Sequence, residues 1–194
     1  MLGYGGTDKP EDPAAYIGSL LVQDLVEILD EERVDKAVVI GVTSLLRALR
    51  AYFTGSYVPP HASFDLQAFL DGTKAIGGRD LFGYWEFFGA DPEAEKIIEA
   101  YIDSFICQWF PQEPEVWRDC IAPRDAHKKN LLADKIVPLG PYMTEENVEY
   151  FRDTFAQGGW AGPLNWYRAA VHGSRSKDDA ATQSDTPRAD IPAS

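Results

Sequence analysis

The feature that most constrains the fold is a short apolar run, Ala37-Val38-Val39-Ile40, which ends at Gly41. A continuous apolar run closed by glycine is typical of a parallel β-strand that is buried on both faces. The preceding segment, from about Ala14 to Glu31, carries apolar residues at helical spacing and predicts a helix. A helix followed by a buried strand is half of an α/β repeat, so we expect part of an α/β core here.

A different pattern starts after Pro59-Pro60, where helical segments follow one another with no convincing strand between them. The expected helices cover Phe64–Ile76, Asp80–Phe88, Asp91–Phe110, Glu113–Cys120, Asp125–Asp134, Thr144–Phe155 and Pro163–Val171. Start and stop signals support several of them, among them Thr144 followed by acidic residues and the Gly158-Gly159 pair. The chain from His172 onward is polar and without periodicity, which predicts disorder.

These patterns divide the chain into three parts. We expect part of an α/β core at residues 1–58, a helical domain at residues 59–171 and a disordered tail at residues 172–194. The predicted fold class is therefore α/β, with a partial core followed by a largely helical domain.

The charge balance argues against some partners. The chain has 18 Lys and Arg residues against 31 Asp and Glu residues, and its formal net charge is −13. Such a charge repels phosphate backbones and anionic lipids, so we expect neither nucleic acid nor a membrane surface as a partner.

The sequence contains neither a signal-peptide pattern nor an apolar stretch long enough to cross a bilayer, which favours a cytoplasmic location.

The cysteines and histidines do not form a metal-binding pattern. Cys107 and Cys120 lack the CxxC spacing, and we interpret them as buried thiols rather than as a disulfide or metal ligands. His61, His127 and His172 are far apart, and none lies in a zinc-binding motif. We place His127, which is next to two lysines, on a solvated helix face and His172 at an exposed helix end. No metal and no cofactor are expected.

Several motifs resemble those of one superfamily. The turn Gly3-Tyr4-Gly5-Gly6-Thr7, with Pro10 behind it, resembles the glycine turn that follows a core strand in lidded α/β-hydrolases. Residues 34–41, VDKAVVIG, resemble the strand that delivers their nucleophile, and Tyr57-Val58-Pro59-Pro60 resembles the exit from their core into the lid. The glycines of the turn suit either a positive φ or a close approach to another segment.

The most specific matches lie in the helical block. Residues 82–88, FGYWEFF, and residues 163–168, PLNWYR, resemble the lid segments of soluble epoxide hydrolases, in which each segment supplies one tyrosine. The resemblance covers roughly residues 1–41 and 52–173. It maps the tyrosine pair onto Tyr84 and Tyr167.

The resemblance implies a small-molecule epoxide substrate, which the family hydrolyses to a vicinal diol through an ester intermediate. Opening an epoxide places negative charge on the ring oxygen, and two phenols in an apolar pocket can donate hydrogen bonds to it. A carboxylate attacks the ring carbon, and a histidine activates the water that hydrolyses the ester. The implied catalytic residues are Tyr84 and Tyr167. Their aromatic neighbours Trp85, Phe87, Phe88 and Trp166 would bind the substrate as an apolar wall.

The chain departs from the family where the nucleophile is expected. An aspartate elbow would follow Ile40-Gly41, but the next residues are Val42-Thr43-Ser44. Ser44 has no G-x-S-x-G frame, and we interpret it as the N-terminal residue of a helix. The base would follow the lid, where His172 leads into the polar tail. We therefore expect a piece of such a hydrolase, truncated at both ends and inactive alone.

Two alternatives stay open at this point. The helical lid could persist as a non-enzymatic module that binds a small molecule or a partner through its aromatic residues. The chain could also be related to haloalkane dehalogenases, which share the aspartate mechanism but hold a halide with tryptophan N–H groups. The paired tyrosine segments argue against the second alternative.

Overall fold

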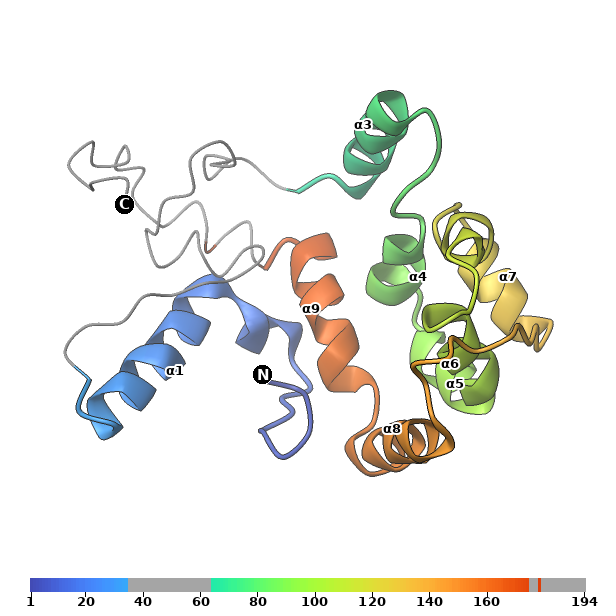
Figure 1. Ribbon diagram of the computed structural model, residues 1–194. Helices are drawn as coiled ribbons and strands as arrows, with labels where there is room; N and C mark the ends of the chain where they lie inside the picture. Colours follow the sequence, from blue (N-terminus) through green and yellow to red (C-terminus); the bar gives the residue numbers. More distant parts are fainter. Residues whose placement is uncertain (35–63, 175–177, 179–194) are drawn as a thin grey trace, which may run out of the picture.

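The computed structural model describes residues 1–34, 64–174 and 178 (Figure 1). The strand predicted over residues 34–41 lies outside the described residues apart from Val34, and so does most of the expected tail. What the structure describes is therefore the predicted N-terminal turn and helix together with the predicted helical block.

The helical block is confirmed. The elements in chain order are η1 (Pro13–Tyr16), α1 (Gly18–Glu31), α3 (Leu66–Gly77), α4 (Tyr84–Ala90), α5 (Ala94–Ala100), α6 (Ile102–Trp109), η2 (Trp117–Ile121), α7 (Ala126–Leu132), α8 (Glu145–Gly158) and α9 (Ala161–Val171). Within the described ranges, β-type pairing is limited to an isolated bridge between Pro111 and Leu139. None of the described helices is both long and apolar enough to span a membrane.

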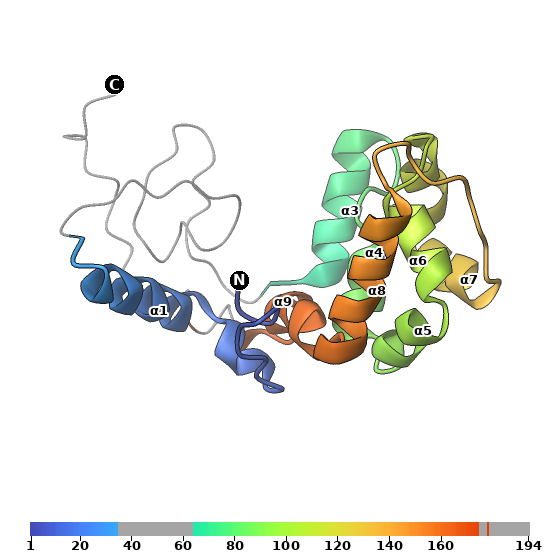
Figure 2. The same cartoon turned by 60° about the horizontal axis from the view of Figure 1, so that its bottom comes forward.

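Helix α9 lies at the centre of the described structure. It packs against α4 on one side and against η1 on the other. Helices α5, α6 and α7 gather beyond α4, whereas α1 extends on the opposite side of α9 (Figures 1 and 2). The two segments that are farthest apart in sequence, the N-terminal turn and the last helix, are therefore side by side.

A backbone contact between two glycines joins the N-terminal turn to α9. Gly3 has a φ of +85°, and a Cβ atom there would lie 2.9 Å from the carbonyl carbon of Gly162. A Cβ atom on Gly162 would lie 2.5 Å from the carbonyl oxygen of Gly3. This one contact therefore requires both properties that we expected of the glycine turn, namely a positive φ and a close approach to another segment.

Side chains of α9 add polar ties to the same segment. The Asn165 amide donates hydrogen bonds of 3.0 Å to the carbonyl oxygens of Pro10 and Glu11. The Trp166 indole N–H donates to the carbonyl oxygen of Leu2 at 3.0 Å. Since Asn165 is fully buried, these bonds satisfy a side chain that would otherwise destabilise the fold. The register of α9 against the N-terminal turn is therefore fixed by both shape and hydrogen bonding.

Four of the expected helices are wrong in their bounds. The helix expected from about Ala14 begins only at Gly18, because Ile17, after the separate 3-10 turn η1, is extended with φ −87° and ψ 157°. The helix expected over residues 91–110 is two helices, because Tyr101 leaves the helical region with φ −123° and ψ 40°. The helix expected from Glu113 is reduced to the π-helical turn η2, in which the N–H of Ala122 bonds to the carbonyl of Trp117 at 2.8 Å. The helix expected from Asp80 begins only at Tyr84.

The core is built mainly from aromatic rings. Phe105 contacts Trp160 at a centroid distance of 4.7 Å, and Trp160 stacks on Phe155 at 4.1 Å. Phe87 and Phe88 of α4 are buried in the same cluster. Rings bury large apolar areas, so the contacts between α4, α6, α8 and α9 form a continuous core despite the short helices.

His127 is buried, which contradicts its expected place on a solvated face. It is 1% exposed and contacts the rings of Phe87 and Phe105 at 5.7 and 5.6 Å. The Trp109 indole N–H donates to Nε2 of His127 at 3.0 Å. Burial lowers the pKa of His127 to about 3, so the ring is neutral at pH 7. The neighbouring lysines misled the prediction because successive helical residues point in different directions.

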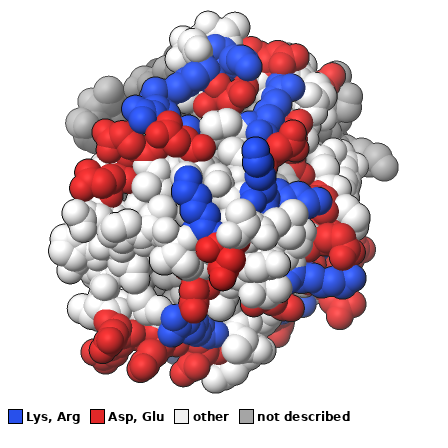
Figure 3. All heavy atoms as spheres, turned by 90° about the vertical axis from the view of Figure 1, so that its right-hand side faces the viewer, with Lys and Arg blue, Asp and Glu red and all other residues white. Residues whose placement is uncertain are grey.

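Charged side chains of both signs are interspersed on the face formed by the α5–α7 side of the molecule (Figure 3). Several are paired, among them Lys128 with Asp91 at 2.5 Å and Lys96 with Glu93 at 3.1 Å. Each ion pair joins one acidic to one basic side chain, so these pairs leave the acidic excess of the chain unchanged.

The glycine contact predicts opposite results for two glycines inside helices. Gly162→Ala should lower the free energy of unfolding by roughly 1–3 kcal/mol, because the new methyl group overlaps Gly3. Gly72→Ala in α3 is the matched control: nothing lies within 4 Å of its Cβ position, so alanine should raise the stability by about 0.5–1 kcal/mol. Urea denaturation of the full chain measures both, and a stabilising Gly162→Ala would refute the contact.

Burial of His127 predicts a loss of stability in acid. Its pKa is about 3 in the folded chain against 6.5 as the ordinary value, so the unfolded chain binds more protons between these limits. The free energy of unfolding should fall by up to about 1.4 kcal/mol for each pH unit below 6.5. His127→Phe should remove this part of the slope between pH 7 and pH 5, whereas His172→Gln should keep it. The prediction would be contradicted if the free energy of unfolding fell equally with pH in the parent and in His127→Phe.

Candidate functional site

The two tyrosines predicted as catalytic meet in the structure. Tyr84 is the first residue of α4, and Tyr167 lies in the second half of α9. Their ring centroids are 6.1 Å apart with an interplanar angle of 76°, so the edge of one ring faces the other. Both side chains are partly buried. Two segments about 80 residues apart in sequence therefore bring their tyrosine rings into contact.

The start of α4 is set by Gly83. Its N–H donates to the carbonyl oxygen of Ala122 at 2.8 Å, and a Cβ atom there would lie 2.4 Å from the backbone nitrogen of Arg124. Because backbone atoms of Pro123 and Arg124 fill this space, no larger residue fits at this position. The segment from Ala122 to Arg124 thus fixes where the Tyr84 helix begins.

Gly89 allows α4 and α9 to pack closely. A Cβ atom on Gly89 would lie 2.6 Å from Cγ2 of Val171 and 3.4 Å from the carbonyl oxygen of Tyr167. Small residues at a helix contact permit a short distance between the axes. The separation of the two tyrosines therefore depends on a glycine one turn after Tyr84.

The structure brings two of the four predicted wall residues to the tyrosine pair. Phe88 contacts Tyr84 at 5.6 Å and Tyr167 at 5.1 Å. Trp85 contacts Tyr167 at 5.3 Å with an interplanar angle of 85°. Trp109 of α6, which we did not predict, contacts Tyr84 at 5.6 Å. No local pattern joins Trp109 to Tyr84, and only its helical spacing from Phe105 marks it as part of a buried face.

The other two predicted wall residues face elsewhere. Phe87 packs on Phe88 and on His127 in the core. Trp166 contacts Tyr16 at 5.7 Å and bonds to the N-terminal segment. Trp166 and Tyr167 are adjacent on a helix, so their side chains point about 100° apart and cannot line the same wall.

A phenol with the ordinary pKa of 10.0 is already protonated at neutral pH, and burial raises the pKa of both tyrosines further. At Tyr84, a hydrogen bond with the Trp85 side chain partly offsets this effect. Burial also raises the pKa of Tyr167, and the charge that Tyr84 would carry raises it further. No hydrogen bond joins the Tyr167 hydroxyl to another residue that the structure describes. The pair therefore offers O–H donors in an aromatic environment at neutral pH.

The remaining predicted residues lie apart from the tyrosines or outside the described ranges. Cys107 and Cys120 are free and buried, as predicted. His172 caps the end of α9 and is exposed, also as predicted. Ser44 and His61 lie outside the described residues. Within the described ranges no group of three or more His, Cys, Asp or Glu side chains could hold a metal ion.

Several known proteins are similar in sequence to this chain, at low identity. No family model matches the chain. Epoxide hydrolase 2 of Siraitia grosvenorii is 27% identical over 182 residues, which cover 87% of this chain and 55% of that protein. Bifunctional epoxide hydrolase 2 of Mus musculus is 26% identical over 188 residues, which cover 87% of this chain and 32% of that protein. The chain thus spans about half or less of the relatives it matches.

The solved structures that resemble this chain are also epoxide hydrolases. An epoxide hydrolase from an endophytic Streptomyces matches with a TM-score of 0.61 and 26% identity, covering 92% of this chain and 57% of that one. Epoxide Hydrolase A from Mycobacterium thermoresistibile matches with a TM-score of 0.61 and 23% identity, covering 92% and 60%. The neighbours are α/β-hydrolases, and the described part of this chain is helical like a lid. More narrowly, the chain is a relative of the epoxide hydrolases, as the tyrosine segments predicted.

The Gly89 contact predicts a coupling across the tyrosine pair. Gly89→Ala should destabilise the chain by roughly 1–3 kcal/mol, because its methyl group overlaps Val171. Val171→Ala removes the overlapping atom, so the double variant should be more stable than the sum of the single changes by about 1 kcal/mol. Urea denaturation of the four proteins measures this coupling. Additive effects would mean that α4 and α9 are not held at the described distance.

Proposed function

We propose that this chain provides the substrate-oxygen site of an epoxide hydrolase-type protein, with Tyr84 and Tyr167 as the hydrogen-bond donors. The observation that supports the proposal is the convergence of the two rings, 6.1 Å apart, from α4 and α9. Trp85 and Phe88 contact the pair and supply apolar surface for the rest of the substrate. The named relatives, which are epoxide hydrolases, support the same chemistry.

The chemical role of the pair follows from its protonation. Both phenols have raised pKa values and keep their protons at neutral pH. An epoxide oxygen is a weak acceptor in the ground state and gains negative charge as the ring opens. Donors held in an apolar environment therefore stabilise the opening ring more than the bound substrate.

We further propose that the chain alone binds epoxides without hydrolysing them. The reaction needs a carboxylate whose oxygen attacks a ring carbon while the carbon–oxygen bond breaks and the ring oxygen takes a proton. A water molecule must then cleave the ester to release the diol. The expected aspartate is replaced by Val42-Thr43-Ser44 after Gly41. The buried His127 already accepts a hydrogen bond from Trp109, so it is a poor candidate for the base.

Ligand titration tests the binding role. Styrene oxide should change the tryptophan fluorescence of the full chain saturably, because Trp85 and Trp109 contact the tyrosines. Ethylbenzene, which has the same apolar body without the oxygen, should bind more weakly. Tyr84→Phe and Tyr167→Phe should each weaken styrene oxide binding by about 3–10-fold, as expected for one lost hydrogen bond, and leave ethylbenzene binding unchanged.

Tyr142→Phe is the matched control, since its hydroxyl donates to the carbonyl of Pro111 at 3.1 Å and not to the pair. Equal affinity for styrene oxide and ethylbenzene would refute the role of the phenols. Formation of 1-phenylethane-1,2-diol above the rate without protein, measured by chromatography, would refute the proposal that the chain does not hydrolyse epoxides.

A further inference from the structure

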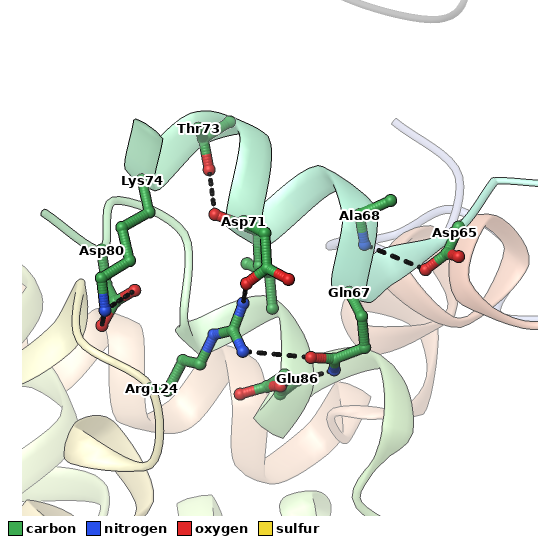
Figure 4. A network of polar contacts seen from close by, with 10 residues as sticks. Asp65, Gln67, Ala68, Asp71, Thr73, Lys74, Asp80, Glu86 and Arg124 are labelled. Carbon is green, nitrogen blue, oxygen red and sulfur yellow. Dashed lines mark hydrogen bonds and ion pairs between the residues drawn. The ribbon is translucent and has the colours of Figure 1, made fainter. Parts of the chain in front are cut away.

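A polar network joins α3 both to α4 and to Arg124, which lies in the turn before α7 (Figure 4). The guanidinium reaches Asp71 of α3, with 2.5 Å between Nη2 and Oδ1, and donates from Nη1 to Oε1 of Gln67 at 3.1 Å. The Gln67 amide then donates to Glu86 of α4 at 2.8 Å. A second ion pair, between Lys74 and Asp80 at 3.3 Å, holds the far end of α3.

The backbone of Arg124 touches the Tyr84 helix at the same time. Its nitrogen would lie 2.4 Å from a Cβ atom on Gly83, the residue before Tyr84. The side chain of Arg124 is 29% exposed, and its Nε atom is buried without a hydrogen-bond partner among the described residues. Arg124 thus contacts both the start of α4 and the exposed face of α3.

Helix α3 and the residues just before it reach the tyrosine pair through Trp85. Phe64, which precedes α3, and Phe69 of α3 contact Trp85 at 5.8 and 5.3 Å. Trp85 in turn contacts Tyr167 at 5.3 Å. A continuous row of rings therefore leads from α3 to Tyr167. Any movement of α3 would release one side of Trp85 and alter the surroundings of the phenols.

We propose that Arg124 is a positioning residue, which holds α3 against α4 and thereby sets the geometry of Trp85 and of the Tyr84–Tyr167 pair. The forked guanidinium suits this role, because it bonds to Asp71 and Gln67 at once and a lysine ammonium cannot reproduce that planar fork. The part of this inference that concerns substrate affinity rests on the proposed function. The part that concerns the geometry of the pair does not.

A positioning role for Arg124 can be distinguished by experiment from a role in stability alone. Asp71 has a side chain that is 70% exposed, and an ion pair with such a partner contributes at most about 1 kcal/mol to stability. Changes to this network should therefore affect the geometry of the site more than the free energy of unfolding. Arg152 of α8 offers a matched control, since it pairs with Asp103 of α6 at 2.6 Å and contacts neither tyrosine in the described network.

Fluorine NMR of the full chain tests the geometric part. The tyrosines are replaced by 3-fluorotyrosine, and the resonances of Tyr84 and Tyr167 are assigned with the Tyr→Phe variants. Arg124→Lys and Asp71→Asn should each shift or broaden both resonances, whereas Arg152→Lys should leave them in place. The free energy of unfolding, measured by urea denaturation, should change by about 1 kcal/mol or less in Asp71→Asn.

Titration with styrene oxide tests the affinity part on the same proteins. Arg124→Lys and Asp71→Asn should weaken binding about 3–10-fold, by the loss of one well-placed hydrogen bond, and Arg152→Lys should not. Unchanged tyrosine resonances in Asp71→Asn would overturn the positioning role. If the parent chain binds styrene oxide, shifted resonances with unchanged affinity would refute the claim that this geometry controls substrate affinity. A parent chain that binds no styrene oxide would refute the proposed function, and the resonances would still decide whether Arg124 sets the geometry of the pair.

Discussion

The close approach of α9 to its two neighbours is the constraint on which the described structure depends. On one side the backbone of Gly162 touches that of Gly3, and on the other side Gly89 of α4 lies against Val171. Neither contact leaves room for a Cβ atom. At Gly3 and Gly162 the space is filled mainly by backbone, whereas at Gly89 it is filled by the side chain of Val171. Tyr167 sits between these contacts, and its position relative to Tyr84 is correspondingly well defined.

The tyrosine pair combines two properties that a donor site for a developing negative charge requires. Aromatic rings from α4 and α6 surround it, and burial raises the pKa of each phenol, which keeps the protons in place. The neutral His127 lies in the adjoining core and is bonded to Trp109, the same residue that contacts Tyr84. The pair therefore presents two protonated phenols beside apolar rings, which is the arrangement on which the proposed function rests.

Local sequence signals predicted the helical block and the pair of tyrosines, because both depend on short motifs with regular spacing. The same signals failed where long-range packing overrides local preference. Tyr101, whose backbone is not helical, interrupts a predicted helix, and His127 is buried although lysines follow it. Trp166 was expected beside Tyr167 but packs on Tyr16, since adjacent helical positions face different directions.

The sequence alone determined the kinship with epoxide hydrolases, the helical character of residues 64–171 and the two residues that carry the proposed chemistry. These are properties of motifs, and a motif can be recognised without coordinates. Only the tertiary structure decided which aromatic residues surround the phenols, that Trp109 is among them, and that Arg124 ties α3 to the same site. Such contacts join residues dozens of positions apart, and nothing in the local order of amino acids specifies which distant side chain will fill the space beside a given ring.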